Sequence, residues 1–247
     1  MRNNYKIWIW GIIIGGLCLF SHLPAYKGNF HFDDFQHIVD NPSVKNPPSY
    51  LYFFTHPESF SRLSKGTLYR PISLLSFALN YRFFGEKPKG WLIVNVVLHS
   101  LNALFFFLLL YRWRGNLWTA VLGGLLFSVM PILSQPVNYL SNRATLLAVV
   151  FLLLALHLDW IEPNEKSQKK ILKVVFAGLF YWLGMLSKEI AVIFPALVML
   201  QDGFLRNKKW GNWRIWAYLF YWTNFGIFLL LRYLMFQTVG SYTYPRG

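Results

Sequence analysis

The sequence contains few charged residues and very few acids. Only 14% of its 247 residues are charged, whereas about a quarter of the residues are charged in a typical soluble domain. The hydrophobic share is 55%, so much of the surface does not face water. This composition excludes an ordinary soluble domain and favours a protein embedded in a membrane.

The scarcity of acids leaves a strong excess of base. There are 24 Lys and Arg against 10 Asp and Glu, a formal net charge of +14. The bases stand in short clusters between long apolar runs, as in membrane proteins, where they set the orientation. We therefore expect no nucleic-acid partner. There is also one cysteine, Cys18, inside the first apolar run. It cannot form an internal disulfide, and it is interpreted as a small apolar side chain.

Seven apolar runs predict about seven transmembrane helices. They cover residues 7–23, 91–111, 117–130, 144–160, 171–186, 190–205 and 216–236. Some are shorter than the roughly 20 residues needed to cross the hydrocarbon, so we expect extension into flanking polar residues or a locally thinned bilayer. The first run is followed by no clean small-x-small cleavage site, which favours an uncleaved span over a signal peptide. The predicted fold is an all-α polytopic transmembrane helix bundle, treated as one domain over residues 1–247.

Short basic clusters precede the first span and follow the second, fourth and sixth. The positive-inside rule then places the N-terminus in the cytoplasm and the long first loop, residues 24–90, on the periplasmic, extracellular or luminal side. Within this loop, apolar residues at Ile72, Leu75 and Leu79, with Phe77 nearby and Pro71 at the first turn, predict an amphipathic helix. Such a helix can lie in the membrane interface.

Two adjacent carboxylates, Asp33 and Asp34, follow the first span. Carboxylates beside a bilayer can act as general acid or base, or hold a divalent cation. The alternative is a solvated turn in which Asp caps a short helix.

A polar stripe crosses the second span. Asn95, His99 and Asn102 recur at spacings of four and three, so they share one helical face, and Arg70 precedes them in the first loop. Polar groups facing lipid are costly, so this face must meet either protein or a water-filled cavity.

Two further cationic positions stand at span ends. Arg143 lies where a helix is expected to start, a poor place for a cation unless an anion such as phosphate is near; the alternative is snorkelling to the headgroups. Lys188 and Glu189 lie between the fifth and sixth spans. They either pair with each other and with water, or place the ammonium beside a lipid phosphate.

Five segments in this order resemble a family. They are F-H-F-D-D-F-Q-H-I-V-D-N-P (30–42), Y-R-P-I-S-L-L-S-F-A-L-N-Y (69–81), N-V-V-L-H-S-L-N-A (95–103), P-V-N-Y-L-S-N-R-A-T-L-L-A (136–148) and L-S-K-E-I-A-V-I-F-P (186–195). Asp202 lies near the end of the last segment. The chain resembles the GT-C class of polytopic glycosyltransferases, and within it the transmembrane O-mannosyltransferases with tetratricopeptide repeats and their bacterial relatives.

The resemblance implies transfer of a sugar from a polyprenyl-phosphate donor to an external hydroxyl on a protein, glycan or lipid. It implies that Asp33 is the general base, and that Asp34 assists it or binds a divalent cation such as Mg²⁺ or Mn²⁺. Cationic side chains would hold the donor phosphate. The predicted substrate-binding residues are Arg70, Asn95, His99, Arg143, Lys188 and Glu189.

The chain departs from the family pattern at Met130 and Gln135, where relatives often have a histidine and an acid. It is also shorter than family members usually are, so we expect a truncated product, a fragment or half of a split enzyme. A non-catalytic or accessory subunit with a second membrane partner is therefore the alternative to an enzyme. A transporter-like protein ranks third, because no inverted repeat is visible.

Overall fold

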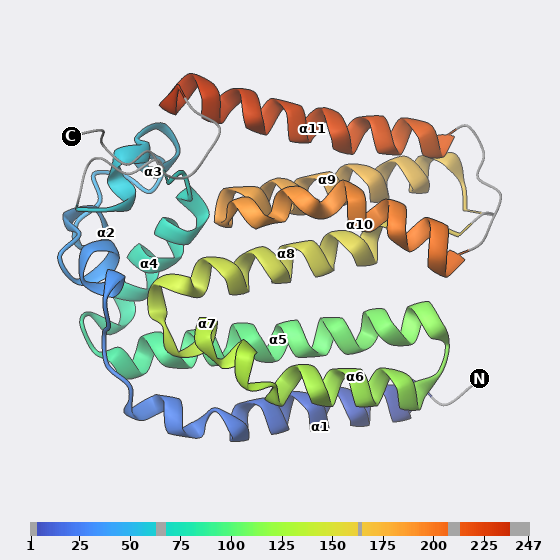
Figure 1. Ribbon diagram of the computed structural model, residues 1–247, viewed down its shortest axis with the longest axis horizontal. Helices are drawn as coiled ribbons and strands as arrows, with labels where there is room; N and C mark the ends of the chain where they lie inside the picture. The colour runs from blue at the N-terminus through green and yellow to red at the C-terminus, as the bar shows by residue number, and fades with distance from the viewer. Residues whose placement is uncertain (1–3, 63–67, 163–164, 207–212, 238–247) are drawn as a thin grey trace.

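The computed structural model describes residues 4–62, 68–162, 165–206 and 213–237. Within these ranges the chain forms helices and turns and contains no strand, which confirms the predicted all-α bundle. The long helices run side by side along the molecule (Figure 1). They are α1 (Asn4–Ser21), α5 (Pro88–Arg114), α6 (Leu117–Val129), α8 (Arg143–Asp159), α9 (Ser167–Ser187) and α11 (Trp213–Phe236).

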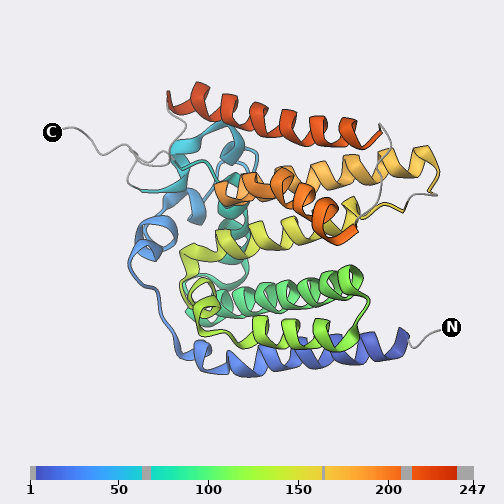
Figure 2. The same cartoon turned by 45° about the vertical axis from the view of Figure 1, so that its right-hand side comes forward.

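The bundle has two groups of helices, each with its own buried core. α1, α5 and α6 pack together around Ile14, Phe107 and Val121. α8, α9 and α11, with the short α10 (Phe194–Leu200), enclose a second core that includes Tyr181 and Phe194. Figure 2 shows the two groups stacked, with α8 beside α5 at the junction.

In the described ranges, five helices are long and apolar enough to cross a membrane, which indicates a multi-pass integral membrane protein. A sixth candidate is the pair Leu117–Val129 and Pro131–Asn138, bent by 54°. The run predicted as a sixth span over residues 190–205 is helical throughout, as the consecutive η6 (Glu189–Ile193), α10 and η7 (Gln201–Arg206), but it is not among these candidates. The number of seven spans therefore stays a prediction.

The first loop is a folded cap at one end of the bundle (Figure 1). Its helices are η1 (Leu23–Lys27), η2 (Phe35–Val39), α2 (Pro42–Lys45), α3 (Tyr52–Thr55), η3 (Pro57–Phe60) and α4 (Pro71–Phe84). The predicted helix is present as α4 and begins at Pro71. Its buried apolar side chains are Leu74, Phe77 and Ala78, whereas Leu79 is exposed, so the packed face is rotated from the one expected. The reason is that α4 packs on a protein core with Phe53 rather than standing alone.

A series of short helices joins α6 to α8 at the same end of the bundle. These are η4 (Pro131–Ser134), α7 (Gln135–Asn138) and η5 (Leu140–Asn142). Pro131 and Pro136 lack an amide N–H and limit how far a helix can continue, which is why this connection is broken into single turns. It brings polar side chains close to the first loop.

Candidate functional site

Asp34 is fully buried, and both of its carboxylate oxygens accept hydrogen bonds. The amide and the hydroxyl of Ser141 each donate to Oδ1 at 2.6 Å, and the amide of His31 donates to Oδ2 at 2.9 Å. Burial raises the pKa of Asp34 from its ordinary value, while these hydrogen bonds act in the opposite direction. Asp34 therefore ties the first loop to the connection before α8.

Asp33 points the other way and is exposed. Gln36 Nε2 donates to the Asp33 Oδ1 at 2.8 Å, and the backbone amide of Asp33 donates to the Tyr139 hydroxyl at 3.2 Å. The preceding Phe32 has φ of 46°, a left-handed conformation that is costly for a bulky residue. Burial, then the nearby Asp33 carboxylate, raises the pKa of the Tyr139 hydroxyl.

A cleft of about 490 Å³ opens in front of the Asp33 carboxylate. Its lining residues are His31, Phe32, Asp33, Gln135, Asn138 and Tyr139. The cleft is thus formed by the first loop on one side and by the α6–α8 connection on the other. Residues about a hundred positions apart meet here, and Asp33 is the carboxylate among them.

Arg70 and Glu189 form an ion pair between the first loop and η6. Arg70 Nε and Nη2 donate to Glu189 Oε2 at 3.0 and 2.8 Å, and Arg232 of α11 donates to Oε1 at 3.1 Å. Burial by itself would raise the pKa of Glu189, but Arg70 and then Arg232 hold it below its ordinary value. Arg232 was not among the predicted residues, although a cation within an apolar run is a recognised sign of function.

Lys188 is half-buried and lies beside the start of α8. Its ammonium donates to Asn142 Oδ1 at 2.9 Å and to Thr145 Oγ1 at 2.7 Å. Burial, and then the charge of Arg70, lowers the pKa of Lys188. Lys188 therefore does not pair with the adjacent Glu189 in the contacts described.

Arg143 is completely enclosed by protein. Its Nε donates to Asn95 Oδ1 at 2.6 Å, and Nη2 donates to the Trp91 carbonyl at 3.1 Å. The guanidinium also lies over the rings of Phe77 and Trp91, at 5.4 and 5.1 Å from their centroids. It does not snorkel to the surface, and its predicted contact with a donor phosphate stays a prediction.

The polar stripe of α5 faces protein. Asn95 donates to the Val137 carbonyl at 3.1 Å, and Asn102 donates to the Leu146 carbonyl at 3.1 Å. His99 is 2% exposed and packs against His22 and Phe127. Of the two alternatives for this face, packing against other segments of the chain is the one observed.

The hydrogen-bond donors around Asp34 decide whether the predicted divalent cation could be bound there. Both of its oxygens already accept hydrogen bonds, and Gln135 supplies an amide where a second acid was expected in the family pattern. Mg²⁺ and Mn²⁺ are bound by several oxygen ligands, often carboxylates. The described residues around Asp34 do not fit such a site.

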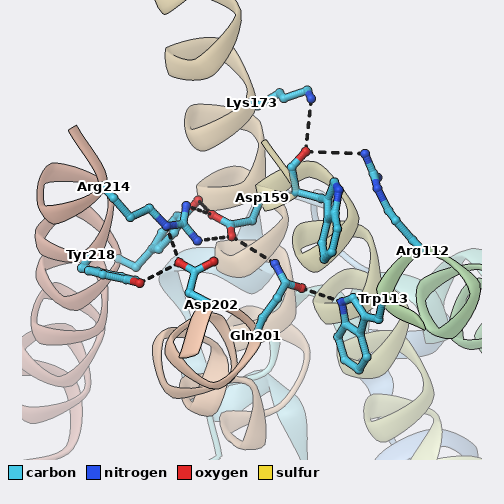
Figure 3. Close-up of polar contacts among 10 residues, drawn as sticks. Arg112, Trp113, Asp159, Lys173, Gln201, Asp202, Arg214 and Tyr218 are labelled. Carbon is cyan, nitrogen blue, oxygen red and sulfur yellow. Dashed lines mark hydrogen bonds and ion pairs between the residues drawn. The ribbon is translucent and has the colours of Figure 1, made fainter. Parts of the chain in front are cut away.

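At the opposite end of the bundle, a buried ionic network joins α8, η7 and α11 (Figure 3). Arg214 Nη1 and Nη2 donate to the two Asp159 oxygens at 2.9 and 2.5 Å, and Nε donates to Asp202 at 2.5 Å. Tyr218 and Tyr221 donate to Asp202 and Asp159 at 2.6 and 2.8 Å. Arg214 belongs to the basic cluster that follows the sixth predicted span, and its burial was not predicted. The signal in the sequence was the presence of Asp159 and Asp202 near the ends of apolar runs.

The fold and the cleft are those of a helical membrane protein with an acid-bearing first loop. Comparison with known proteins shows which proteins the chain is similar to. The chain is 29% identical over 203 residues to protein O-mannosyl-transferase TMTC4 of Homo sapiens, covering 72% of this chain and 27% of the relative. It is 32% identical over 215 residues to TMTC1 of Homo sapiens, covering 80% and 24%, and 29% identical over 209 residues to tmtc2 of Xenopus laevis, covering 80% and 24%.

The predicted resemblance to the transmembrane O-mannosyltransferases is therefore confirmed over most of this chain. The chain spans about a quarter of the length of these curated relatives. No family model and no solved structure matches it.

Proposed function

We propose that this protein is a membrane glycosyltransferase that transfers a sugar from a polyprenyl-phosphate donor to an external hydroxyl. The names of the relatives favour mannose as the sugar and a protein as the acceptor. The observation that carries the proposal is the segment from Tyr139 to Asn142. Tyr139 contacts Asp33, Ser141 holds Asp34, and Asn142 accepts from Lys188. One short segment thus links the candidate base to a candidate phosphate-binding cation.

In the proposed reaction, the Asp33 carboxylate accepts the proton of the acceptor hydroxyl. The hydroxyl oxygen then forms a bond to the anomeric carbon of the sugar, and the bond from that carbon to the phosphate oxygen breaks. Lys188, and Arg70, which is paired with Glu189, stabilise the negative charge that develops on the leaving phosphate. Asp34 positions Asp33 by fixing the backbone of the loop.

The other predicted site residues are proposed to support the site of the sugar donor by holding other side chains in place. Asn95 holds the Arg143 guanidinium, and Glu189 holds Arg70. His99 lies among buried aromatic rings near α1. A direct contact of these residues with the donor stays a prediction.

The orientation of the protein is part of the proposal, with the N-terminus in the cytoplasm and the first loop outside. Thr55→Cys introduces a thiol at an exposed site of that loop, and Ser167→Cys introduces one at the start of α9. A membrane-impermeant maleimide should label the first variant and not the second in intact cells. Wild-type protein sets the background, since Cys18 is buried. The reverse pattern of labelling would overturn this orientation.

The enzymatic test uses membranes containing the intact chain, a radiolabelled polyprenyl-phosphate sugar and an acceptor extract. Transfer should occur, and Asp33→Asn should lower its rate by about 10²- to 10⁴-fold, the usual contribution of a general base. Asp40→Asn is the matched control, since Asp40 is an exposed acid of the same loop. No transfer by the wild-type chain, when a longer homologue works in the same assay, would sink the proposal.

A second candidate function is a non-catalytic or split subunit that requires another membrane protein. The observation that favours it is Gln135, an amide at the cleft where the family pattern has an acid. Affinity capture from solubilised membranes should then recover a membrane partner, and addition of that partner should restore transfer. A monodisperse protein that transfers sugar by itself would exclude this candidate.

A further inference from the structure

Three metal-ligating side chains meet inside the bundle, at the end of α1 that leads into the first loop. Cys18, His22 and His99 are all buried, and one ligand atom of each lies within 4.8 Å of the others. Among the described residues, this is the one group of three or more His, Cys, Asp or Glu that meets this condition. We propose that this trio, Cys18, His22 and His99, binds a transition-metal ion that prefers sulfur and nitrogen ligands, such as Zn²⁺. This proposal does not depend on the proposed transferase activity.

Two of the three ligands are positioned by the backbone of α1. Cys18 and His22 are four residues apart, and the His22 amide donates to the Cys18 carbonyl at 3.3 Å, which continues the helical pattern past Ser21. Side chains four apart on a helix share one face. The Cys18 sulfur and the His22 ring therefore both point toward α5, where His99 lies with its ring 5.1 Å from that of His22.

The hydrogen bonds of His22 leave one nitrogen for a metal. Its Nδ1 lies 2.9 Å from the Cys18 carbonyl oxygen and 3.1 Å from the Ser21 hydroxyl. Since the carbonyl can only accept, the Nδ1 proton is placed there, and Nε2 carries a free lone pair. A carbonyl that fixes the tautomer of a ligating histidine in this way is a common feature of metal sites.

His99 supplies the independent sign of a missing ligand. Its Nε2 is buried and has no hydrogen-bond partner in the part of the chain that the structure describes. The side chain is 2% exposed, so water does not compensate. Buried polar atoms are nearly always paired, and an unpaired one calls for an explanation. A metal ion bound between His99, His22 and Cys18 would satisfy this nitrogen.

The donor set decides which ion is bound. One thiolate and two imidazoles favour Zn²⁺ or a similar ion, whereas Mg²⁺, Ca²⁺ and Mn²⁺ prefer carboxylate and carbonyl oxygens. In a tetrahedral zinc site the ligand atoms are about 3.3 to 3.8 Å apart, from the usual Zn–S and Zn–N distances. The three ligand atoms here lie within 4.8 Å of one another, so a pair must close by at most about 1.5 Å to hold the ion.

Binding exchanges a proton for the ion. The Cys18 thiol loses its proton to solvent as the sulfur–metal bond forms, and the two neutral imidazoles donate lone pairs, so no oxidant or reductant is needed. Three protein ligands leave a fourth position for water or another donor. The ion would cross-link α1 to α5, and His22, at 8% exposure, is the ligand nearest the surface.

The test uses Co²⁺ as a spectroscopic substitute for Zn²⁺. The full chain is purified in detergent through a tag without histidine, stripped with a chelator and titrated with Co²⁺. We expect one equivalent to bind, with visible d–d bands of a tetrahedral ion and a near-ultraviolet band from sulfur-to-cobalt charge transfer. Excess Zn²⁺ should remove both bands, and excess Mg²⁺ should not. Because Cys18 is the one thiol of this chain, the charge-transfer band can arise from no other residue.

Variants locate the site. Cys18→Ser should abolish the charge-transfer band, and His99→Asn should weaken Co²⁺ binding by at least about tenfold. His157→Asn is the matched control, since His157 is another intramembrane histidine that lies outside the trio and contacts the Phe105 carbonyl; it should leave the spectrum unchanged. Absence of the charge-transfer band in wild-type protein at every Co²⁺ concentration overturns the proposal. So does a spectrum that Mg²⁺ removes. The wild-type titration decides by itself if a variant fails to fold.

Discussion

Ser141 donates both its amide and its hydroxyl to the same carboxylate oxygen of Asp34, at 2.6 Å in each case, across 107 positions of sequence. Asp34 is fully buried, so these hydrogen bonds are what allows a carboxylate to remain there. They also decide where Asp33 points. With Asp34 held inward, its neighbour is directed into the cleft.

We predict that Ser141→Ala lowers the free energy of unfolding by about 1 to 3 kcal/mol, because one donor to a buried acid is lost. Denaturant unfolding in detergent micelles measures this. Ser134→Ala is the matched control in the same connection, since its hydroxyl contacts only the nearby Pro131 carbonyl in the contacts described. That change should stay within about 0.5 kcal/mol of wild type. Equal effects of the two substitutions would show that the Asp34 contact contributes little.

We predict that Lys188→Gln lowers the rate of sugar transfer by about 10²- to 10³-fold, as expected for removal of a group that stabilises developing charge. The amide keeps a donor for Asn142 and Thr145, so the fold should persist. Lys45→Gln is the control, because Lys45 pairs with Glu86 at the surface. Transfer rates at saturating donor measure the effect. A rise in KM for the donor with kcat unchanged would contradict a role in the transition state.

His37 should make the protein acid-sensitive. Burial lowers its pKa from 6.5 to about 4, so it is neutral in the folded protein while the unfolded chain takes up a proton below pH 6.5. Stability should therefore be complete above pH 6.5 and be lost as the pH falls toward 4. From pH 7 to pH 5 the loss attributable to His37 is about 2 kcal/mol.

The variant His37→Phe isolates this contribution, because the phenyl ring can keep the contact with Phe60 and does not titrate. Thermal unfolding of both proteins at pH 7 and pH 5 is the measurement. The variant should lose less stability than wild type on acidification. An identical loss in the two proteins would rule out His37 as the source.

Arg214→Met should destabilise the protein by about 3 to 5 kcal/mol, because Asp159 and Asp202 would be left buried without their shared cation (Figure 3). Lys169→Met is the control, an exposed cation at the same end of the bundle. If the cost arises from the unpaired carboxylates, adding Asp159→Asn to Arg214→Met should recover part of it. A double variant no more stable than the single one would argue for lost packing instead.

Part of this architecture could be predicted from the sequence, and two helices show which features could and which could not. The α5 stripe of Asn95, His99 and Asn102 was predicted to avoid lipid, since helical spacing and the cost of a polar group in hydrocarbon are local properties. The helix that begins at Pro71 was likewise predicted. Its buried face was not, because that face depends on packing against Phe53 and Trp91, which belong to other helices.

The sequence by itself determined the all-helical membrane fold, because apolar run length and side-chain periodicity are set by consecutive residues. It also brought two carboxylates to one place, Asp33 and Asp34, without distinguishing them. Only the tertiary structure decided that Asp34 is buried on Ser141 and that Asp33 faces the cleft. The physical reason is that burial and hydrogen bonding depend on which distant segments pack together, and no local pattern specifies that packing.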